Sequence, residues 1–343
     1  MRRVLVSGLG LVGSNIAAKL LREGYSVVGY DIRPTHKLHD PIFRRELERI
    51  EFVEGDVTDF SKYLQVAKDY DVEGIIHTPA AVMENWQETV KVNVIGALNA
   101  LEIGRLLNLR RVLYISSGSV FGDREDLTPI KDTDPVSPRS YYGLTKCLAE
   151  IMVNAYYELF DLSAAAVRLS GVFGRGWHQM EFFIQGTIFL ALEGERIQVV
   201  DHYFPYTYIN DVTEALYLLY TKPGKLKYTL YSVSSEKGAT WESIVSCIKK
   251  NVPQANIELI KPKPILMPEV QKREWRGGPS LIRGPFAMER MKEEFGWTPK
   301  YTVEEGIEEF IQYIKRLKEE EPEWYAEQVK KFKSLYRPPP IMR

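Results

Sequence analysis

The sequence predicts an α/β protein in which a doubly wound parallel sheet of the Rossmann type is followed by a smaller mixed α/β substrate domain. Three observations support this prediction. Short apolar runs alternate with helical patterns as far as about Gly174. A glycine-rich turn directly follows the first apolar run, and the regular alternation weakens beyond Gly174.

The apolar runs are short and rich in β-branched residues, as the buried strands of a parallel sheet are. They comprise Arg3–Val6, Ser26–Tyr30, Glu51–Val53, Gly74–His77, Arg111–Ile115 and Ala164–Val167. Helical patterns lie between them at Ser14–Arg22, Phe60–Lys68, Trp86–Leu107 and Tyr141–Phe160. This alternation predicts right-handed crossovers, with helices covering both faces of the sheet.

The chain of 343 residues is long enough for two domains. We expect the sheet domain over residues 1–174, with parts of 200–235 returning to it, and the substrate domain over 175–320. Residues 321–343 would form a C-terminal helix and a proline-rich tail. The expected later helices are Asp211–Tyr220, Thr240–Lys250 and two charged surface helices, Val303–Lys318 and Glu323–Lys333, separated at Pro322.

Composition argues against several classes of function. The 45 Lys and Arg residues balance 46 Asp and Glu, so no broad basic surface for nucleic acid is expected. No apolar run approaches the ~20 residues that a membrane span needs. Two cysteines, Cys147 and Cys247, fit a reducing compartment, and glycines interrupt the apolar N-terminus. We therefore expect a cytoplasmic protein without a signal peptide.

Gly8, Gly10 and Gly13 form a G-x-G-x-x-G motif between a strand and a helix. The first glycine permits a tight turn, the second lets the backbone approach a pyrophosphate, and the third lets the helix pack closely on the strand. The helix would then start at the phosphates, with the backbone of Leu11 and Val12 facing them. The motif predicts a dinucleotide-binding turn, although three glycines can also form a simple turn.

Asp31 strengthens the dinucleotide prediction. It ends the second predicted strand, 31 − 13 = 18 positions after the last glycine, where a carboxylate would bind the hydroxyls of the adenosine ribose. A carboxylate there would repel a 2′-phosphate, so NAD is favoured over NADP. Arg33 lies close enough in the sequence to oppose that preference.

Tyr142 and Lys146 open a predicted helix at positions i and i+4, so their side chains share one face. A phenol with a pKa near ~10 is a poor base at neutral pH. A neighbouring ammonium, together with a positively charged nicotinamide ring, would favour the phenolate and lower that pKa. The pair could equally be an ordinary contact on a helix surface.

Taken in order along the chain, these motifs resemble an extended short-chain dehydrogenase/reductase of the NAD-dependent epimerase/dehydratase family. The segments that carry the resemblance after the glycine turn are Gly55–Asp59, His77–Ala81, Asn93–Asn99, Ser116–Gly122, the Tyr142/Lys146 pair, Arg168–Gly174 and Phe295–Pro299. The resemblance covers about residues 3–310. Each segment alone is weak, whereas the ordered set is specific.

The resemblance implies a role for each of these positions. Cofactor contacts would come from Asp56, Val57, Thr78, Pro79, Ala80, Tyr142 and Lys146, with Asn93 in the hydrogen-bond network behind the site. Ser117 would orient the reacting oxygen, and Ser119 would replace it if a bulge shifted the register. Tyr142 would exchange the proton. Lys146 would bind the nicotinamide ribose, and a homodimer would form through the helices at 86–107 and 141–160.

Substrate contacts are expected from the segments that the family places near the reacting carbon. The candidates are Ala81, Ser119, Arg175, Trp177 and His178, with Trp86 and Tyr208 in neighbouring segments. Core packing or ordinary surface is an equally good interpretation for the aromatic residues. The five histidines show no metal-ligand spacing, and His36 and His39 are predicted on a polar loop, so no metal is expected.

The sequence departs from the family pattern at three places. The usual glycine turn is G-x-x-G-x-x-G, and this chain is one residue shorter. Nucleotide-sugar members usually carry an asparagine where Gly171 stands, and an arginine where Phe204 stands, seven positions before Asp211. Those side chains grip the substrate's diphosphate, and a phenyl ring cannot replace a bidentate cation. Arg175 or Arg196 would have to compensate.

We therefore expect an NAD-dependent oxidoreductase acting on a secondary alcohol or ketone of a small, sugar-like substrate that lacks a nucleotide diphosphate. The alternative is a sugar epimerase that retains NAD through oxidation and re-reduction. A non-enzymatic NAD-sensing protein is a third possibility, disfavoured by the complete Ser/Tyr/Lys set. A dehydratase would need an acidic pair near Ser117, where Gly118 and Ser119 supply none.

Overall fold

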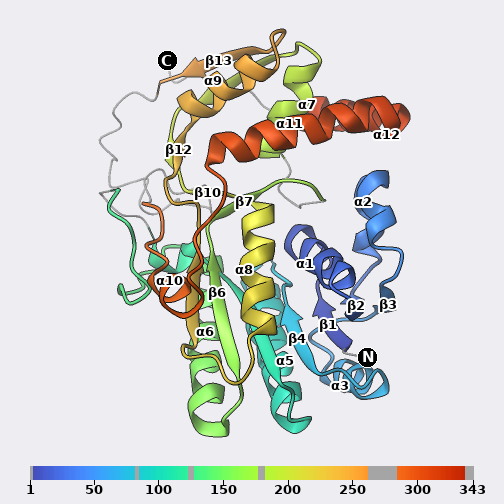
Figure 1. Ribbon diagram of the computed structural model, residues 1–343, viewed down its shortest axis with the longest axis vertical. Coiled ribbons are helices and arrows are strands. Elements are labelled where there is room, and N and C mark those ends of the chain that lie inside the picture. Colours follow the sequence, from blue (N-terminus) through green and yellow to red (C-terminus); the bar gives the residue numbers. More distant parts are fainter. Residues whose placement is uncertain (1–2, 82–84, 123–126, 177–181, 262–283, 337–343) are drawn as a thin grey trace.

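The predicted doubly wound sheet is present in the computed structural model, which describes residues 3–81, 85–122, 127–176, 182–261 and 284–336. Seven parallel strands follow the order β11-β6-β5-β4-β1-β2-β3 (Figure 1). They are β1 Arg3–Ser7, β2 Ser26–Asp31, β3 Glu51–Glu54, β4 Gly74–His77, β5 Arg111–Ser117, β6 Ala164–Leu169 and β11 Leu230–Val233. The edge strand β11 comes from the segment that was expected to return to the sheet.

Helices cover both faces because neighbouring strand residues point to opposite sides. Val4 and Val6 of β1 pack in one apolar cluster, whereas Leu5 packs in the other. The first cluster includes α1 Leu11–Arg22 and α8 Ile209–Thr221, and the second includes α3 Phe60–Asp69, α5 Gly96–Leu106 and α6 Tyr141–Phe160 (Figure 1). The sheet is therefore buried on both faces, as the run of apolar residues in each strand predicts.

The helix predicted over Trp86–Leu107 is present as one helical run that contains a π-helical turn. It consists of α4 Trp86–Val90, a π-helical turn at Lys91–Ile95 and α5. The π-helical turn contains Asn93, whose side chain is fully buried. Turns of this kind interrupt the regular hydrogen-bond ladder and are found most often at functional sites.

The smaller C-terminal region combines short sheets with helices. Strand β8 Arg196–Val200 pairs with β13 Asn256–Ile260, β9 Tyr203–Phe204 with β12 Ala239–Thr240, and β10 Tyr206–Tyr208 with β7 Gly171–Phe173. The helices of this region are α7 Thr187–Leu192, α9 Trp241–Asn251, α10 Glu289–Phe295, α11 Val303–Glu320 and α12 Pro322–Leu335, with a π-helical turn at Phe182–Gly186. The N-terminal part of the chain also contains α2 Pro41–Glu46 and 3₁₀ turns at Thr35–Leu38 and Gly118–Phe121.

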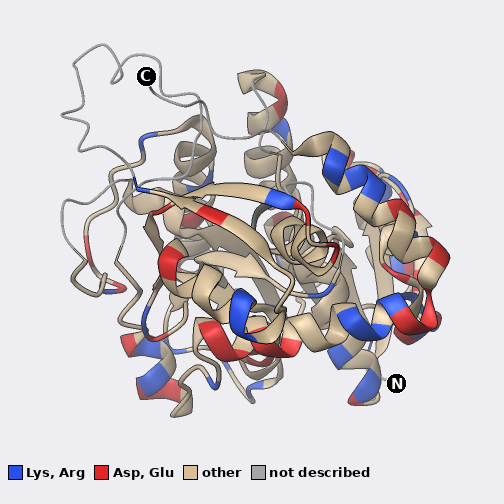
Figure 2. Ribbon diagram, turned by 90° about the horizontal axis from the view of Figure 1, so that it is seen from above, with Lys and Arg blue, Asp and Glu red and all other residues tan. Residues whose placement is uncertain are grey.

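The two C-terminal helices are more than charged surface helices. Ile307, Phe310 and Ile314 of α11 and Phe332 of α12 are fully or almost fully buried. Their outer faces carry the charged residues, which lie interspersed over the helices seen from above in Figure 2. The sequence pattern predicted the charged outer faces of α11 and α12, but not how much of their inner faces is buried.

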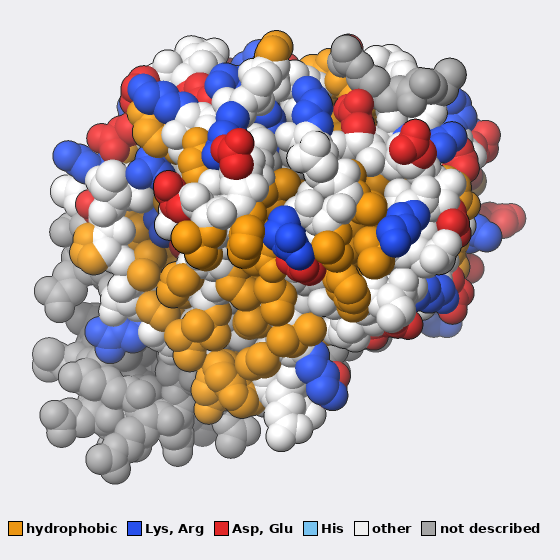
Figure 3. Space-filling view, turned by 90° about the horizontal axis from the view of Figure 1, so that it is seen from below, with side chains coloured by type: hydrophobic (Ala, Val, Ile, Leu, Met, Phe, Trp, Pro, Cys, Tyr) orange, Lys and Arg blue, Asp and Glu red, His pale blue; other side chains and the backbone are white. Residues whose placement is uncertain are grey.

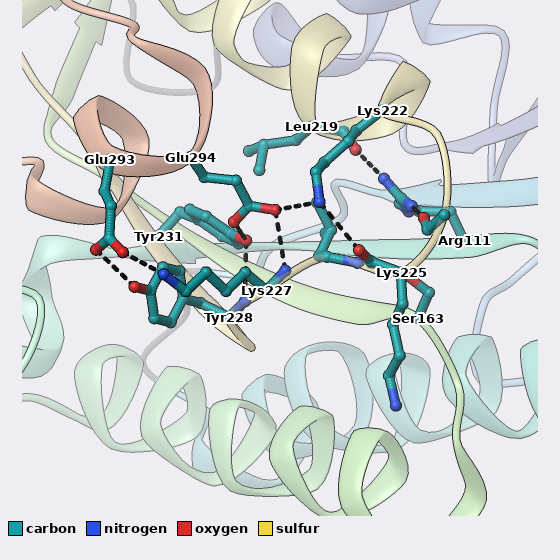
Figure 4. Close-up of polar contacts among 12 residues, drawn as sticks. Arg111, Ser163, Leu219, Lys222, Lys225, Lys227, Tyr228, Tyr231, Glu293 and Glu294 are labelled. Atoms are coloured by element: carbon teal, nitrogen blue, oxygen red, sulfur yellow. Dashed lines mark hydrogen bonds and ion pairs between the residues drawn. The ribbon is translucent and has the colours of Figure 1, made fainter.

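Polar contacts of Glu293 and Glu294 hold helix α10 beside the edge strand β11 (Figure 4). The Glu294 carboxylate pairs with Lys222 and accepts hydrogen bonds from the Tyr231 hydroxyl and the Lys227 backbone N–H. Glu293 accepts from Tyr228 at 2.6 Å. These contacts join the C-terminal part of the chain to the sheet, and one apolar cluster contains residues from both regions.

Among the described residues, no helix is long and apolar enough to cross a membrane. They also contain no group of three His, Cys, Asp or Glu side chains arranged to hold a metal ion.

Candidate functional site

The glycine turn lies at the carboxyl end of β1 and presses against the start of the segment that follows β4. Gly8 has a φ of +76°, and a Cβ there would lie 2.8 Å from Thr78 Oγ1. A Cβ at Gly13 would lie 1.8 Å from the Gly8 carbonyl oxygen, whereas a Cβ at Gly10 would meet nothing within 4 Å. The first and third glycines are therefore needed for packing, and the second borders open space.

The start of α1 fits an anionic group. Its N-cap is Gly10, which provides no side-chain cap, and its first turn contains no acidic residue. The first N–H groups of an α-helix lack intrahelical partners and carry the positive end of the helix dipole. The N–H groups of Leu11 and Val12 are in this position, so the turn offers donors to a pyrophosphate.

Asp31 lies at the end of β2 beside this turn. One of its carboxylate oxygens accepts a hydrogen bond from the Leu9 N–H at 2.7 Å, so the carboxylate is held in place by the turn itself. The Gly55 N–H donates to the Asp31 carbonyl oxygen at 2.8 Å, which brings Asp56 and Val57 alongside. The structure thus gathers the three residues expected at the adenosine end.

The residues after β4 form a wall beside the glycine turn. The Thr78 hydroxyl lies 2.8 Å from the Gly8 carbonyl oxygen and donates to it. Pro79 is partly exposed and Ala80 is exposed, so both present surface, as expected for cofactor-lining residues. Ala81 is only 4% exposed. The side chain of Ala81 is therefore packed in the interior, and a substrate contact at this position stays a prediction.

Asn93 supports this wall from behind and offers no free polar group to the cofactor. Its side-chain oxygen accepts from the Ala81 N–H at 2.8 Å. Its amide nitrogen donates to the Ala81 carbonyl at 2.9 Å and to the Thr145 hydroxyl at 3.0 Å. The Thr145 hydroxyl in turn donates to the Tyr142 carbonyl at 2.8 Å. Asn93 thus connects the wall to the helix that carries Tyr142 and lies in a hydrogen-bond network behind the wall.

Ser117, Tyr142 and Lys146 converge at the carboxyl end of β5. Ser117 ends β5, and Tyr142 lies in the first turn of α6, which Ser140 caps by accepting from the Gly143 N–H at 3.1 Å. The Ser117 side chain lies close enough to Tyr142 to lower the pKa of the phenol in part. The Ser119 hydroxyl lies 3.2 Å from that of Ser117, so either serine reaches the same region.

The Lys146 ammonium lies beneath the tyrosine, 5.5 Å from the centre of the Tyr142 ring. The side chain is almost completely buried, and its Nζ donates to the Ile115 carbonyl at 2.7 Å. Burial lowers the pKa of Lys146 to about 7, and the nearby Glu150 carboxylate raises it in part. Burial also raises the pKa of Tyr142, against a smaller lowering by the Ser117 side chain. In the chain alone desolvation outweighs the Ser117 contribution, whereas the lowering expected from the Lys146 ammonium together with a bound nicotinamide ring stays a prediction.

Two other residues expected near the substrate, Arg175 and Tyr208, contact acidic side chains of the protein itself. The Arg175 guanidinium pairs with Glu46 of α2, and its Nε donates to the Asn15 side chain at 3.2 Å. It is therefore engaged away from a substrate anion, and its expected substrate role is corrected to a structural one. Tyr208 is buried and donates to Glu309 at 3.2 Å. Trp177 and His178 lie outside the described residues.

Gly171 and Phe204, the two departures at the substrate end, contact each other. A Cβ at Gly171 would lie 2.5 Å from Cε1 of Phe204. The phenyl ring also packs against Tyr206, with ring centres 5.0 Å apart. The ring therefore fills the space that a side chain at position 171 would need. Arg196 pairs with Glu258 at 3.0 Å.

The sequence predicts His39 on a polar loop and gives no sign that it lies near the glycine turn. The structure buries it against the glycine turn, leaving only 1% of the residue exposed. No motif spacing relates this position to the turn. Its place could not be read from the sequence.

Comparison with known proteins identifies the family. The profile of the NAD dependent epimerase/dehydratase family matches residues 4–233. The chain belongs to that enzyme family. Its cofactor is NAD, as the glycine motif and Asp31 predicted. The extended short-chain dehydrogenase/reductase resemblance is thereby confirmed.

Curated relatives match along almost the entire chain at low identity. Protein CapI of Staphylococcus aureus is 24% identical over 346 residues, covering 96% of this chain and 100% of the relative. A UDP-glucose 4-epimerase of Lacticaseibacillus casei is 24% identical over 354 residues, covering 95% and 99%.

Solved structures show the same fold. A dTDP-glucose 4,6-dehydratase of Bacillus anthracis, in complex with NAD, has a TM-score of 0.79 at 22% identity, covering 96% of this chain and 100% of that one. The UDP-glucose 4-epimerase of Thermotoga maritima, with UDP-glucose, has a TM-score of 0.77 at 20% identity, covering 92% and 99%. At these identities the likeness establishes the architecture.

The burial of Lys146 predicts a pH-dependent stability. Its pKa is about 7 in the folded chain, against the ordinary lysine value of 10.5 in the unfolded chain. Between these values the unfolded chain binds more protons, so this group makes the free energy of unfolding rise as pH increases. The matched control is Lys146→Met, which cannot titrate. Measured by urea unfolding, the stability of wild type relative to this variant should increase with pH through this window. A difference that does not change with pH would contradict the lowered pKa.

Proposed function

We propose that the chain transfers a hydride between NAD and a secondary alcohol or ketone carbon of a small, sugar-like substrate. The observation that carries this proposal is the convergence of Ser117, Tyr142 and Lys146 at the carboxyl ends of the sheet. Ligands of open α/β sheets bind at this edge. The three side chains provide a hydrogen-bond donor, a proton-exchanging group and a cation within one small region.

The cofactor would lie across the same edge of the sheet. The N–H groups of Gly10, Leu11 and Val12 would hold the pyrophosphate, and Asp31 would bind the adenosine ribose. Asp56 and Val57 would border the adenine, with Thr78, Pro79 and Ala80 along the length of the dinucleotide. NAD, when bound, supplies the carbon that accepts or donates the hydride.

The chain's own residues would handle the proton and the substrate oxygen. Tyr142 would take the hydroxyl proton during oxidation and return it during reduction. The Ser117 hydroxyl would hold the same oxygen, since its side chain acts on the same phenol. Lys146 would favour the phenolate electrostatically from beneath the ring and hold the nicotinamide ribose.

We predict that Tyr142→Phe lowers turnover by at least ~10²-fold, as expected for the loss of a general acid/base, while NAD affinity is kept. The matched control is Tyr217→Phe, which removes a hydroxyl from α8 on the opposite face of the sheet. Turnover is followed as NADH formation, using the active compound from a panel of aldoses, sugar acids and polyols. Retained activity in Tyr142→Phe would remove this residue from the mechanism.

The substrate proposal rests on the contact between Gly171 and Phe204. A diphosphate carries about two negative charges, and burying them is costly unless cations and hydrogen bonds replace water. The chain offers a phenyl ring and no side chain at the two positions where nucleotide-sugar members usually grip this group. Two lost contacts, at ~1.5–3 kcal/mol for each charged hydrogen bond, would weaken a micromolar ligand toward millimolar.

We therefore predict that UDP and UDP-glucose bind the NAD-loaded protein with no better than about millimolar affinity, measured by calorimetric titration. Phe204→Arg introduces a cation at the position in question and should strengthen binding. Phe204→Leu serves as the matched control and should not. Micromolar binding of either ligand to wild type would contradict the substrate proposal.

A second candidate is an epimerase that keeps its NAD through a cycle of oxidation and re-reduction. The names of the relatives favour it, because several are UDP-glucose 4-epimerases. An epimerase often purifies with bound cofactor, whereas a dehydrogenase releases NADH into solution. Denaturing the purified protein and measuring the released dinucleotide separates the two: a stoichiometric amount favours the epimerase.

We also propose that two copies associate through α5 and α6. Tyr141, Leu144, Leu148 and Ile151 recur every three or four residues along α6, and each is at least 39% exposed. Figure 3 shows hydrophobic side chains gathered at the end of the molecule where these helices lie. Such a stripe is costly to leave in water. Light scattering should give a dimer, and Leu148→Glu with Ile151→Glu should give a monomer. A monomeric wild type would contradict this proposal.

A reducing, cytoplasmic location remains part of the proposal. Cys147 and Cys247 are both free thiols, and both are buried. The chain therefore uses cysteine as a packing residue, which is typical of proteins in reducing compartments.

A further inference from the structure

His39 forms hydrogen bonds with the glycine turn on the side that faces the protein interior. Its Nε2 lies 2.7 Å from the Ser14 hydroxyl oxygen and 3.1 Å from the Leu9 carbonyl oxygen. The Ser14 hydroxyl donates to the same carbonyl at 2.7 Å. Leu9 and Ser14 are fully buried, and His39 is almost so. These three groups therefore form a closed hydrogen-bonded triangle beneath the turn.

The arrangement of acceptors around the ring favours the tautomer with the proton on Nε2. A carbonyl oxygen can only accept, so an unprotonated Nε2 would point one lone pair at another. With Nε2 protonated, the ring donates toward the Ser14 hydroxyl and the Leu9 carbonyl, and the hydroxyl donates to the carbonyl. Burial also lowers the pKa of His39 to about 3, so the ring is neutral at physiological pH.

The orientation of the Leu9 carbonyl determines that of the next N–H group. The peptide unit is planar and trans, so the Leu9 C=O and the Gly10 N–H point in opposite directions. His39 and Ser14 hold the carbonyl toward the interior. The Gly10 N–H must then point away from the interior, and a Cβ at Gly10 would meet nothing within 4 Å, so this residue borders open space.

The geometry points to His39 as a positioning residue that aims the Gly10 N–H at the pyrophosphate of NAD. This inference rests on the proposed placement of the pyrophosphate at the start of α1. It explains how a turn one residue shorter than the family's usual one keeps its donors in place: a side chain from the segment after β2 holds the carbonyl.

The surroundings of His39 hold its ring in one place. The ring packs against Phe43, with ring centres 5.0 Å apart, and a Cβ at Gly176 would lie 3.3 Å from its Nδ1. The next residue, Asp40, caps α2 by accepting from the Phe43 N–H at 2.9 Å and also accepts from the Tyr313 hydroxyl at 2.6 Å. The segment that carries His39 is thus anchored to both α2 and α11.

The experiment compares two ligands that differ in the pyrophosphate. The affinity for ADP-ribose is measured by calorimetry and that for adenosine by ligand-observed NMR. His39→Phe keeps a ring in the cavity and removes the donor, whereas His39→Gln keeps a donor near the Nε2 position. Ser14→Ala removes the hydroxyl of the triangle and provides a second variant should His39→Phe fold poorly. Thermal unfolding confirms that each variant is folded.

We expect His39→Phe and Ser14→Ala to bind ADP-ribose about tenfold more weakly, as for one weakened hydrogen bond to a charged group. Adenosine affinity should not change, and His39→Gln should keep most of the ADP-ribose affinity. Unchanged ADP-ribose binding in folded variants, or an equal loss for both ligands, would overturn the inference. A wild type that binds neither NAD nor ADP-ribose would instead refute the cofactor placement on which the inference rests.

Discussion

The close approach of the glycine turn to the wall after β4 is the constraint on which the site depends. Gly8 and Gly13 leave no room for a Cβ, because Thr78 and the Gly8 carbonyl occupy that space. This contact sets the start of α1 at the carboxyl ends of β1 and β4, with no side-chain cap in the way. Parallel strand order then brings the ends of β5 and β6 to the same edge, so the glycine turn and the Ser/Tyr/Lys group lie along one edge of the sheet.

Much of this arrangement could be predicted from the sequence, because its determinants are local. Buried parallel strands have continuous apolar runs, and a glycine motif at a strand end fixes its own turn. The positions of Asn93 and His39 were not predictable in this way. The π-helical turn at Asn93 and the triangle around His39 depend on partners far away in the chain. The direction of the Tyr142 pKa shift also depends on burial, which only the folded chain defines.

Gly171 and Phe204 both depart from the family pattern, and in the structure the two residues are in contact. Read separately, Gly171 and Phe204 are each a missing polar side chain. In the structure the ring of one occupies the space beside the other, so a side chain restored at position 171 alone would collide with it. A side chain at position 171 would therefore require Phe204 to change as well. This coupling gives a physical reason to separate the chain's proposed substrate from those named for its relatives.

The measurement that tests the central claim most directly is an experimental structure of the chain with NAD. The account predicts the pyrophosphate within hydrogen-bond distance of the N–H groups of Gly10, Leu11 and Val12, with the adenosine ribose at Asp31. It also predicts the nicotinamide ring beside the Tyr142 hydroxyl and its ribose at Lys146. A pyrophosphate bound away from the start of α1, or a nicotinamide ring out of reach of Tyr142, would contradict it.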